Sequence, residues 1–239
     1  MSSIPIASLL ALGFVLGLKH ALDADHLAAV STMTTERRSL FGSSMIGALW
    51  GLGHTISLII AGVMVILFHF KIGARTSQTL ELAVGLMLIV LGINGLRKLV
   101  HGAQIHMHAH EHDGYWHVHP HIHGRKDEDG PHMHHGLKSG MRPLLVGMIH
   151  GMAGSAALTL LVLATIPSPL FGFIYIAIFG IGSIGGMMIM STLCALPARL
   201  TSVRFAQANF VLRGLAGVFS LCLGIFIVYD IGVVNDLLR

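Results

Sequence analysis

The sequence His20-Ala-Leu-Asp23-Ala-Asp25-His26 places two histidines and two carboxylates within seven residues. The surrounding segment, from Ile4 to Val30, is otherwise apolar. An ionisable side chain near the centre of a bilayer costs at least about 2.5 kcal/mol, so such residues pair, line a cavity or bind a substrate ion. Imidazole and carboxylate groups together indicate a divalent metal ion. We therefore expect this stretch to bind metal within a membrane span.

The composition is that of an integral membrane protein. Of the 239 residues, 54% are hydrophobic, 11% are charged and 29 are glycine, a frequency that suits closely packed membrane helices. The net charge is +4, but the basic residues lie between hydrophobic runs and form no basic face, which argues against nucleic-acid binding. Cys194 and Cys222 both lie inside apolar runs and are interpreted as packing residues.

Six stretches approach or exceed the length of about 20 residues that crosses the hydrocarbon core. They lie near residues 5–30, 42–69, 79–100, 142–166, 170–195 and 208–233. The sequence thus predicts an all-α integral membrane protein with six transmembrane helices. A polar segment divides the chain into a first three-helix repeat (1–100), a His-rich loop (101–140) and a second three-helix repeat (141–239).

The two halves resemble each other at three places. The matches are Gly17-Leu-Lys-His20 with Gly147-Met-Ile-His150, Trp50-Gly-Leu-Gly-His54 with Phe179-Gly-Ile-Gly-Ser183, and the Gly85 to Gly92 segment with the Gly217 to Gly224 segment. The three offsets are 130, 129 and 132 residues. A repeat with an odd number of spans lies upside down relative to its copy, and substrate sites in such folds lie near the midplane between the halves.

The distribution of Lys and Arg predicts the orientation. One set of loops carries eleven of these residues and the opposite set carries three. The positive-inside rule makes the richer side cytoplasmic. We therefore expect a multi-pass protein of the cell inner (plasma) membrane, with both termini outside and the His-rich loop in the cytoplasm.

Helix geometry restricts how the first motif binds an ion. On an ideal helix His20, Asp23 and His26 lie within an arc of about 120°, whereas Asp25 points roughly 100° away from His26. A straight helix cannot direct all four side chains to one ion. Either Asp25 orients a histidine through an indirect contact, or the helix loosens at this point.

Further polar residues lie in the other spans. His54, between glycines in the second span, and His150, the repeat counterpart of His20, are predicted metal ligands together with the first motif. Asn94, Ser155 and Thr159 are weaker candidates for residues along the transport pathway.

The loop from His101 to His135 contains twelve histidines, several of them alternating with other residues. Such a tract cannot build a packed core, and its expected chemistry is loose chelation of transition metals. It does not select one metal over another.

The string His20-x4-Asp25-His26 resembles the hallmark of the nickel/cobalt transporter family, and Leu52-Gly53-His54-Thr55 is similar to that family's second motif. The segment His150-Gly-Met-Ala-Gly-Ser155 is more similar to the urease-accessory permeases of the UreH type. This resemblance implies uptake of Ni²⁺ or Co²⁺ through a site formed by the motif residues.

We therefore predict a permease and not an enzyme, with no cofactor other than the transported ion. The expected partners are the metal ion, the lipid bilayer and a cytoplasmic metal chaperone or urease-maturation protein. Three alternatives stay open. They are a Ni/Co exporter loaded by the His-rich loop, an intramembrane zinc metalloenzyme with Asp25 as its base, and a membrane-bound metal sensor or chaperone.

Overall fold

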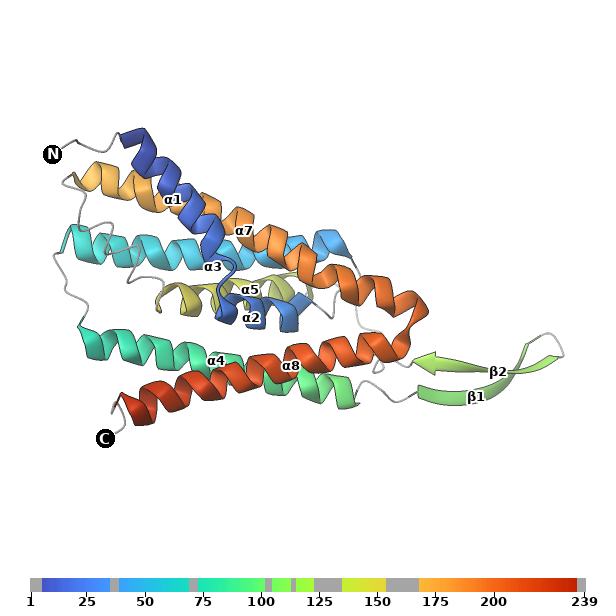
Figure 1. Cartoon of the computed structure of the whole chain (residues 1–239). Coiled ribbons are helices and arrows are strands. Elements are labelled where there is room, and N and C mark those ends of the chain that lie inside the picture. The colour runs from blue at the N-terminus through green and yellow to red at the C-terminus, as the bar shows by residue number, and fades with distance from the viewer. Residues whose placement is uncertain are drawn as a thin grey trace.

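The computed structural model describes residues 6–34, 39–68, 73–101, 105–112, 115–122, 135–153 and 168–235. The helices in these ranges are α1 (Ile6–His20), α2 (Ala24–Thr34), α3 (Leu40–Ile66), α4 (Ala74–His101), α5 (His135–Gly151), α7 (Pro169–Arg204) and α8 (Ala206–Tyr229). A short π-helix, η1 (Asp230–Val234), continues α8. The short helix α2 contacts α3, α4, α7 and α8, so it lies inside the bundle (Figure 1).

Four of the described helical stretches are long and apolar enough to cross a membrane. They are Leu40–Ile66, Ala74–His101, Pro169–Thr201 and Gln207–Val234. A further pair, α1 and α2, passes the same test together but is bent by 54° at the break between them. Five of the six predicted spans are thus matched, by four continuous helices and one bent pair. Of the predicted span 142–166, α5 covers the first part and residues 154–166 lie outside the described ranges.

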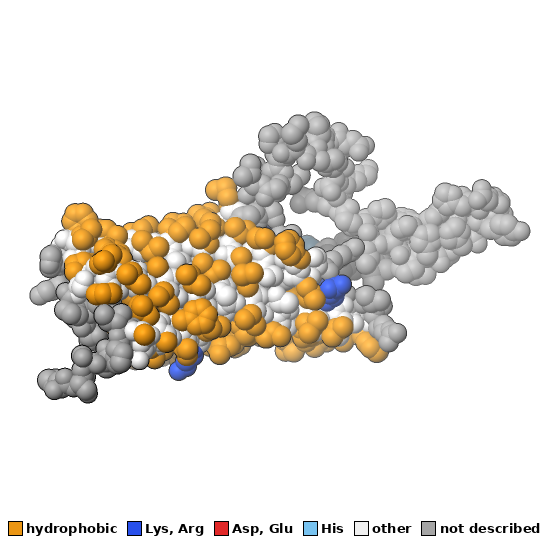
Figure 2. Space-filling view, turned by 90° about the horizontal axis from the view of Figure 1, so that it is seen from above, with side chains coloured by type: hydrophobic (Ala, Val, Ile, Leu, Met, Phe, Trp, Pro, Cys, Tyr) orange, Lys and Arg blue, Asp and Glu red, His pale blue; other side chains and the backbone are white. Residues whose placement is uncertain are grey.

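Large apolar side chains cover the outside of the bundle. Phe41, Val100 and Leu200 are among the exposed ones, and Figure 2 shows hydrophobic side chains over most of the visible described surface. An apolar surface of this extent would be a liability in water but matches contact with lipid. The described helices therefore form a multi-pass membrane protein.

The helical prediction did not include a β-hairpin that lies within the His-rich loop. β1 (Ile105–His112) pairs antiparallel with β2 (Tyr115–Ile122), and the hairpin extends beyond the end of the helical bundle (Figure 1). The two strands are separated by Asp113-Gly114, a dipeptide that favours two-residue hairpin turns. The backbone register pairs histidine with histidine at three positions, which are His106 with His121, His108 with His119, and His110 with His117.

Glycines allow the helices of one half to pack on those of the other. A Cβ atom at Gly17 in α1 would collide with the backbone of Phe179 in α7, and one at Gly147 in α5 would collide with the backbone of Trp50 in α3. The sequence matches pair Gly17 with Gly147 and Phe179 with Trp50. The first helix of each half thus contributes a glycine that packs against the second helix of the other half. The close backbone approach leaves no space for a side chain at either glycine.

We predict that Gly17→Ala lowers the free energy of unfolding by about 1–3 kcal/mol, because the added methyl group has to displace the α7 backbone. The matched control is Gly185→Ala, since a Cβ atom at Gly185 meets nothing within 4 Å. The control should be neutral or slightly stabilising, because alanine favours helix over glycine. Thermal unfolding of both variants in detergent checks this, and a Gly17→Ala protein as stable as the control would contradict the packing.

Candidate metal centre

The break between α1 and α2 forms the centre. α1 ends at His20 and α2 begins at Ala24, and a turn connects them in which Leu22 N–H donates to Lys19 O (2.9 Å) and Asp23 N–H to His20 O (3.1 Å). Because the chain bends by 54° at this point, His20 and His26 do not follow the spacing of one helix. The expectation that a straight helix could not direct all four motif side chains to one point is consistent with this break.

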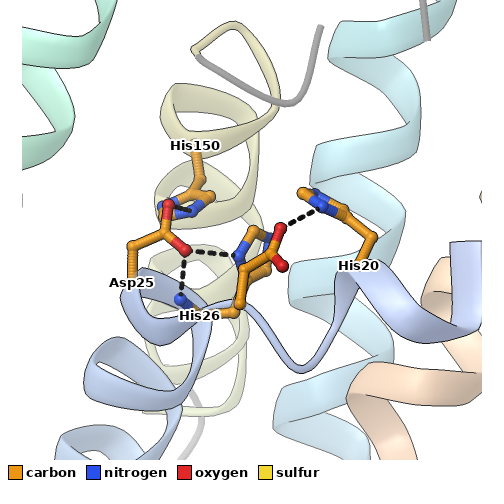
Figure 3. Close-up of polar contacts among 5 residues, drawn as sticks. His20, Asp25, His26 and His150 are labelled. Atoms are coloured by element: carbon orange, nitrogen blue, oxygen red, sulfur yellow. Dashed lines mark hydrogen bonds and ion pairs between the residues drawn. The ribbon is translucent and has the colours of Figure 1, made fainter. Parts of the chain in front are cut away.

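Four histidine rings are gathered at the break, and Figure 3 shows His20, His26 and His150 among them. His20 comes from α1, His26 from α2, His54 from α3 and His150 from α5, and none is more than 9% exposed. The ring centroids of His26 lie 4.3 Å from His20, 5.5 Å from His54 and 4.1 Å from His150. His26 is thus the central ring of the cluster, and the fold brings together the four histidines that the sequence predicted as ligands.

Each of the two carboxylates orients histidine rings. Asp25 Oδ1 accepts a hydrogen bond from His26 Nδ1 (3.0 Å), and Asp25 Oδ2 accepts one from His150 Nε2 (2.9 Å). Asp23 Oδ2 lies 2.7 Å from His20 Nδ1. Both oxygens of Asp25 therefore contact rings from different halves of the chain, and Figure 3 shows this carboxylate between the two rings. A carboxylate that fixes the tautomer of a histidine is a common support of metal ligands.

The remaining ring nitrogens have no hydrogen-bond partner among the described residues. They are His20 Nε2, His26 Nε2, His150 Nδ1 and both nitrogens of His54. In a neutral imidazole that donates from Nδ1 to a carboxylate, Nε2 carries a free lone pair. A buried polar atom without a hydrogen bond costs about 1–3 kcal/mol, so a cluster of such lone pairs needs a reason. A bound cation would satisfy them.

Two groups of side chains have the spacing of metal ligands. One ligand atom from each of His20, His26 and His54 lies within 4.8 Å of the others, and the same holds for Asp25, His26 and His150. Imidazole nitrogen with carboxylate oxygen suits Ni²⁺, Co²⁺, Zn²⁺ and Cu²⁺, and does not suit Mg²⁺ or Ca²⁺. The donor set therefore fits a divalent transition metal.

Aromatic side chains close the centre. Trp50 is fully buried and stacks on the His26 ring, with centroids 5.3 Å apart and planes 22° from parallel. Phe179 lies 5.8 Å from the His20 ring. Sequence reasoning gave neither residue a role, although Trp50 lies one helical turn before His54 and therefore on the same face of α3. These rings hold the histidines in place and exclude water from them.

Not every candidate residue lies in the cluster. Asp23 contacts His20 but its side chain is 52% exposed, so it lies at the edge of the centre. Asn94 is exposed on α4 and belongs to neither ligand group of the described residues. Ser155 and Thr159 lie outside the described residues.

Similar proteins are found by sequence. No protein-family model matches the chain, and no solved structure matches it. Two Arabidopsis thaliana proteins, chloroplast protein FOR GROWTH AND FERTILITY 1 and 2, are 27% identical over 177 residues, covering 73% of this chain but only 46% and 44% of their own lengths. The urease accessory protein UreH of Bacillus sp. (strain TB-90) is 36% identical over 240 residues, covering 100% of this chain and 98% of the relative. This match confirms the resemblance stated from the sequence. The chain belongs to the family of the urease accessory protein UreH.

Proposed function

We propose that this protein transports divalent transition-metal ions, Ni²⁺ or Co²⁺, across the membrane through the centre formed by His20, His26, His54 and His150. One observation carries the proposal: in the part of the chain that the structure describes, buried imidazole nitrogens without hydrogen-bond partners lie together among lipid-facing helices. A buried cluster of that kind is costly in an empty protein and useful for binding an ion that has lost its water. The name of the Bacillus relative, a urease accessory protein, supports nickel, because urease maturation requires this metal.

With their hydrogen bonds to histidine in place, the carboxylates orient imidazole rings. Asp23 and Asp25 hold His20 and His26 through their Nδ1 atoms, which leaves both Nε2 atoms for the metal. The alternative of a zinc enzyme is less well supported. A hydrolase needs a free base beside a metal-bound water, whereas both oxygens of Asp25 already accept hydrogen bonds from histidines.

The architecture we propose is six spans in two inverted repeats, with the metal between them. Three pairs of corresponding helices, α1 with α5, α3 with α7 and α4 with α8, support it. In the contact between α3 and α7, Gly47 meets Met187 while Gly62 meets Ile176, so these two helices run antiparallel. In the contact between α4 and α8, Gly85 meets Gly224 while Gly92 meets Gly217, with the same result.

For the direction of transport we propose uptake. The positive-inside rule places the His-rich loop in the cytoplasm, where it would hold metal after influx and pass it to a chaperone or urease-maturation protein. The same loop is the reason to keep export as a second candidate. The histidines of this tract would equally load a metal for efflux.

The ligand assignment predicts that His26→Ala and His20→Ala each reduce nickel flux into proteoliposomes at limiting metal by at least about tenfold, because a dehydrated ion cannot replace a lost imidazole with water. His101→Ala is the control, since His101 is an exposed histidine at the end of α4 that contacts Arg97 O. Near-normal flux in either centre variant, at equal amounts of folded protein, would refute the assignment.

The topology predicts opposite accessibility for two serines at the starts of α3 and α7. Ser39 caps α3 and Ser168 precedes Pro169 at the start of α7. In a variant without Cys194 and Cys222, a cysteine at position 39 should react with an impermeant reagent only from the cytoplasm. A cysteine at position 168 should react only from outside. Labelling of both from one side would exclude the inverted arrangement.

Replacing the twelve loop histidines by asparagine distinguishes the two directions. An importer should keep its initial uptake rate but accumulate less metal in cells, because the loop acts only after influx. An exporter loaded by the loop should lose its initial efflux at low metal. Initial rates in inside-out and right-side-out vesicles measure this, and unchanged uptake rate together with unchanged accumulation would leave the loop without the proposed role.

A further inference from the structure

We propose that the centre holds its metal at two alternative positions that share the His26 ring. This inference rests on the proposed function and specifies how the metal would move through the site. Position 1 consists of His20, His26 and His54, and position 2 consists of Asp25, His26 and His150. His26 is the only residue that belongs to both groups in the described part of the chain.

The two nitrogens of His26 have different surroundings. Nε2 is buried without a partner, and the rings of His20 and His54 lie 4.3 and 5.5 Å from the His26 ring. Nδ1 lies 3.0 Å from Asp25 Oδ1, whose other oxygen lies 2.9 Å from His150 Nε2. We assign Nε2 to position 1, because it is the nitrogen of His26 without a hydrogen bond. We assign Nδ1 to position 2, because it is the nitrogen that contacts Asp25.

Two ligand-to-ligand distances in position 2, one from each oxygen of Asp25, are close to those of a metal site. With metal–ligand bonds of about 2.1 Å, neighbouring ligand atoms lie about 3.0 Å apart in octahedral and about 3.4 Å apart in tetrahedral geometry. The two contacts of Asp25, at 3.0 and 2.9 Å, are near the octahedral value. A cation would replace the hydrogen-bonding protons with little movement of the side chains.

The His26 ring cannot bind metal at both positions at the same time. A neutral imidazole has a single lone pair, so His26 binds metal through Nε2 or through Nδ1 but not through both. When the metal moves from position 1 to position 2, the bond to Nε2 breaks and a bond to Nδ1 forms. The ring proton of His26 moves from Nδ1 to Nε2 and that of His150 moves from Nε2 to Nδ1, so the number of protons on each ring does not change.

The surroundings of His26 favour a transfer without rotation of the ring. Trp50 stacks on one of its faces and His150 meets it at an interplanar angle of 76°. Position 1 uses only residues of the first half, on α1, α2 and α3, whereas position 2 includes His150 from α5 in the second half. The transfer would therefore pass the metal from one half of the protein to the other.

Binding of Co²⁺ tests the two positions, because its visible absorption depends on its ligands. The experiment uses the full-length protein with the twelve loop histidines replaced by asparagine. His54→Phe removes position 1 and keeps an aromatic ring, and His150→Gln removes position 2 and keeps an N–H donor for Asp25. The control is Ser220→Ala, which changes a buried serine between α8 and α4.

We expect each single variant to bind one Co²⁺ per chain, with two different spectra, and the parent spectrum to be a mixture of both. The double variant should bind none, and each single variant should lose at least about tenfold in flux. Binding by a single variant also shows that it is folded.

Loss of all binding in His54→Phe with an unchanged spectrum in His150→Gln would overturn the proposal, as would two Co²⁺ per parent chain. Normal binding by the parent without any flux would instead refute the transport function.

Discussion

The contact of Asp25 with His26 and His150 is the interaction on which the centre depends. The two oxygens of one carboxylate accept from rings that belong to α2 and α5, at 3.0 and 2.9 Å. Both rings are at most 2% exposed, whereas the Asp25 side chain is 34% exposed. A charge among membrane helices is tolerated where hydrogen bonds and a nearby cation stabilise it. This carboxylate therefore joins the two halves and sets the tautomers of both rings.

The broken first helix brings the residues of this motif together. Because the chain bends by 54° between α1 and α2, the His20 ring at the end of α1 lies 4.3 Å from the His26 ring in the first turn of α2. Asp25 also lies in that first turn, where its Oδ1 accepts from the His26 backbone N–H at 2.9 Å. The second half has a related feature, since α5 ends at Gly151, one residue after His150. Glycine contacts such as those of Gly17 and Gly147 bring the helix ends close enough to meet.

Much of the centre follows from the sequence, because charged and imidazole groups are rare in apolar segments. The motif of His20 to His26, the repeat match of His20 with His150 and the place of His54 between glycines in the second span suffice to name the histidines of the cluster. The direction of each side chain does not follow, because it depends on a helix break that no proline or glycine marks. The sequence contains a pattern typical of a hairpin, since Asp113-Gly114 stands between two segments of alternating residues. The loop is instead interpreted from its histidine content, as a tract that chelates metal loosely. The role of Trp50 depends on tertiary packing that a helix pattern does not contain.

The central claim is that buried imidazoles, and not the loop or solvent, bind the metal in the helical bundle. X-ray absorption spectroscopy at the nickel edge tests it most directly, on full-length protein whose loop histidines are replaced by asparagine and which carries one Ni²⁺ per chain. The account predicts the outer-shell scattering of at least two imidazole rings, reduced in His26→Ala. A spectrum of oxygen ligands alone, or one that His26→Ala leaves unchanged, would contradict it.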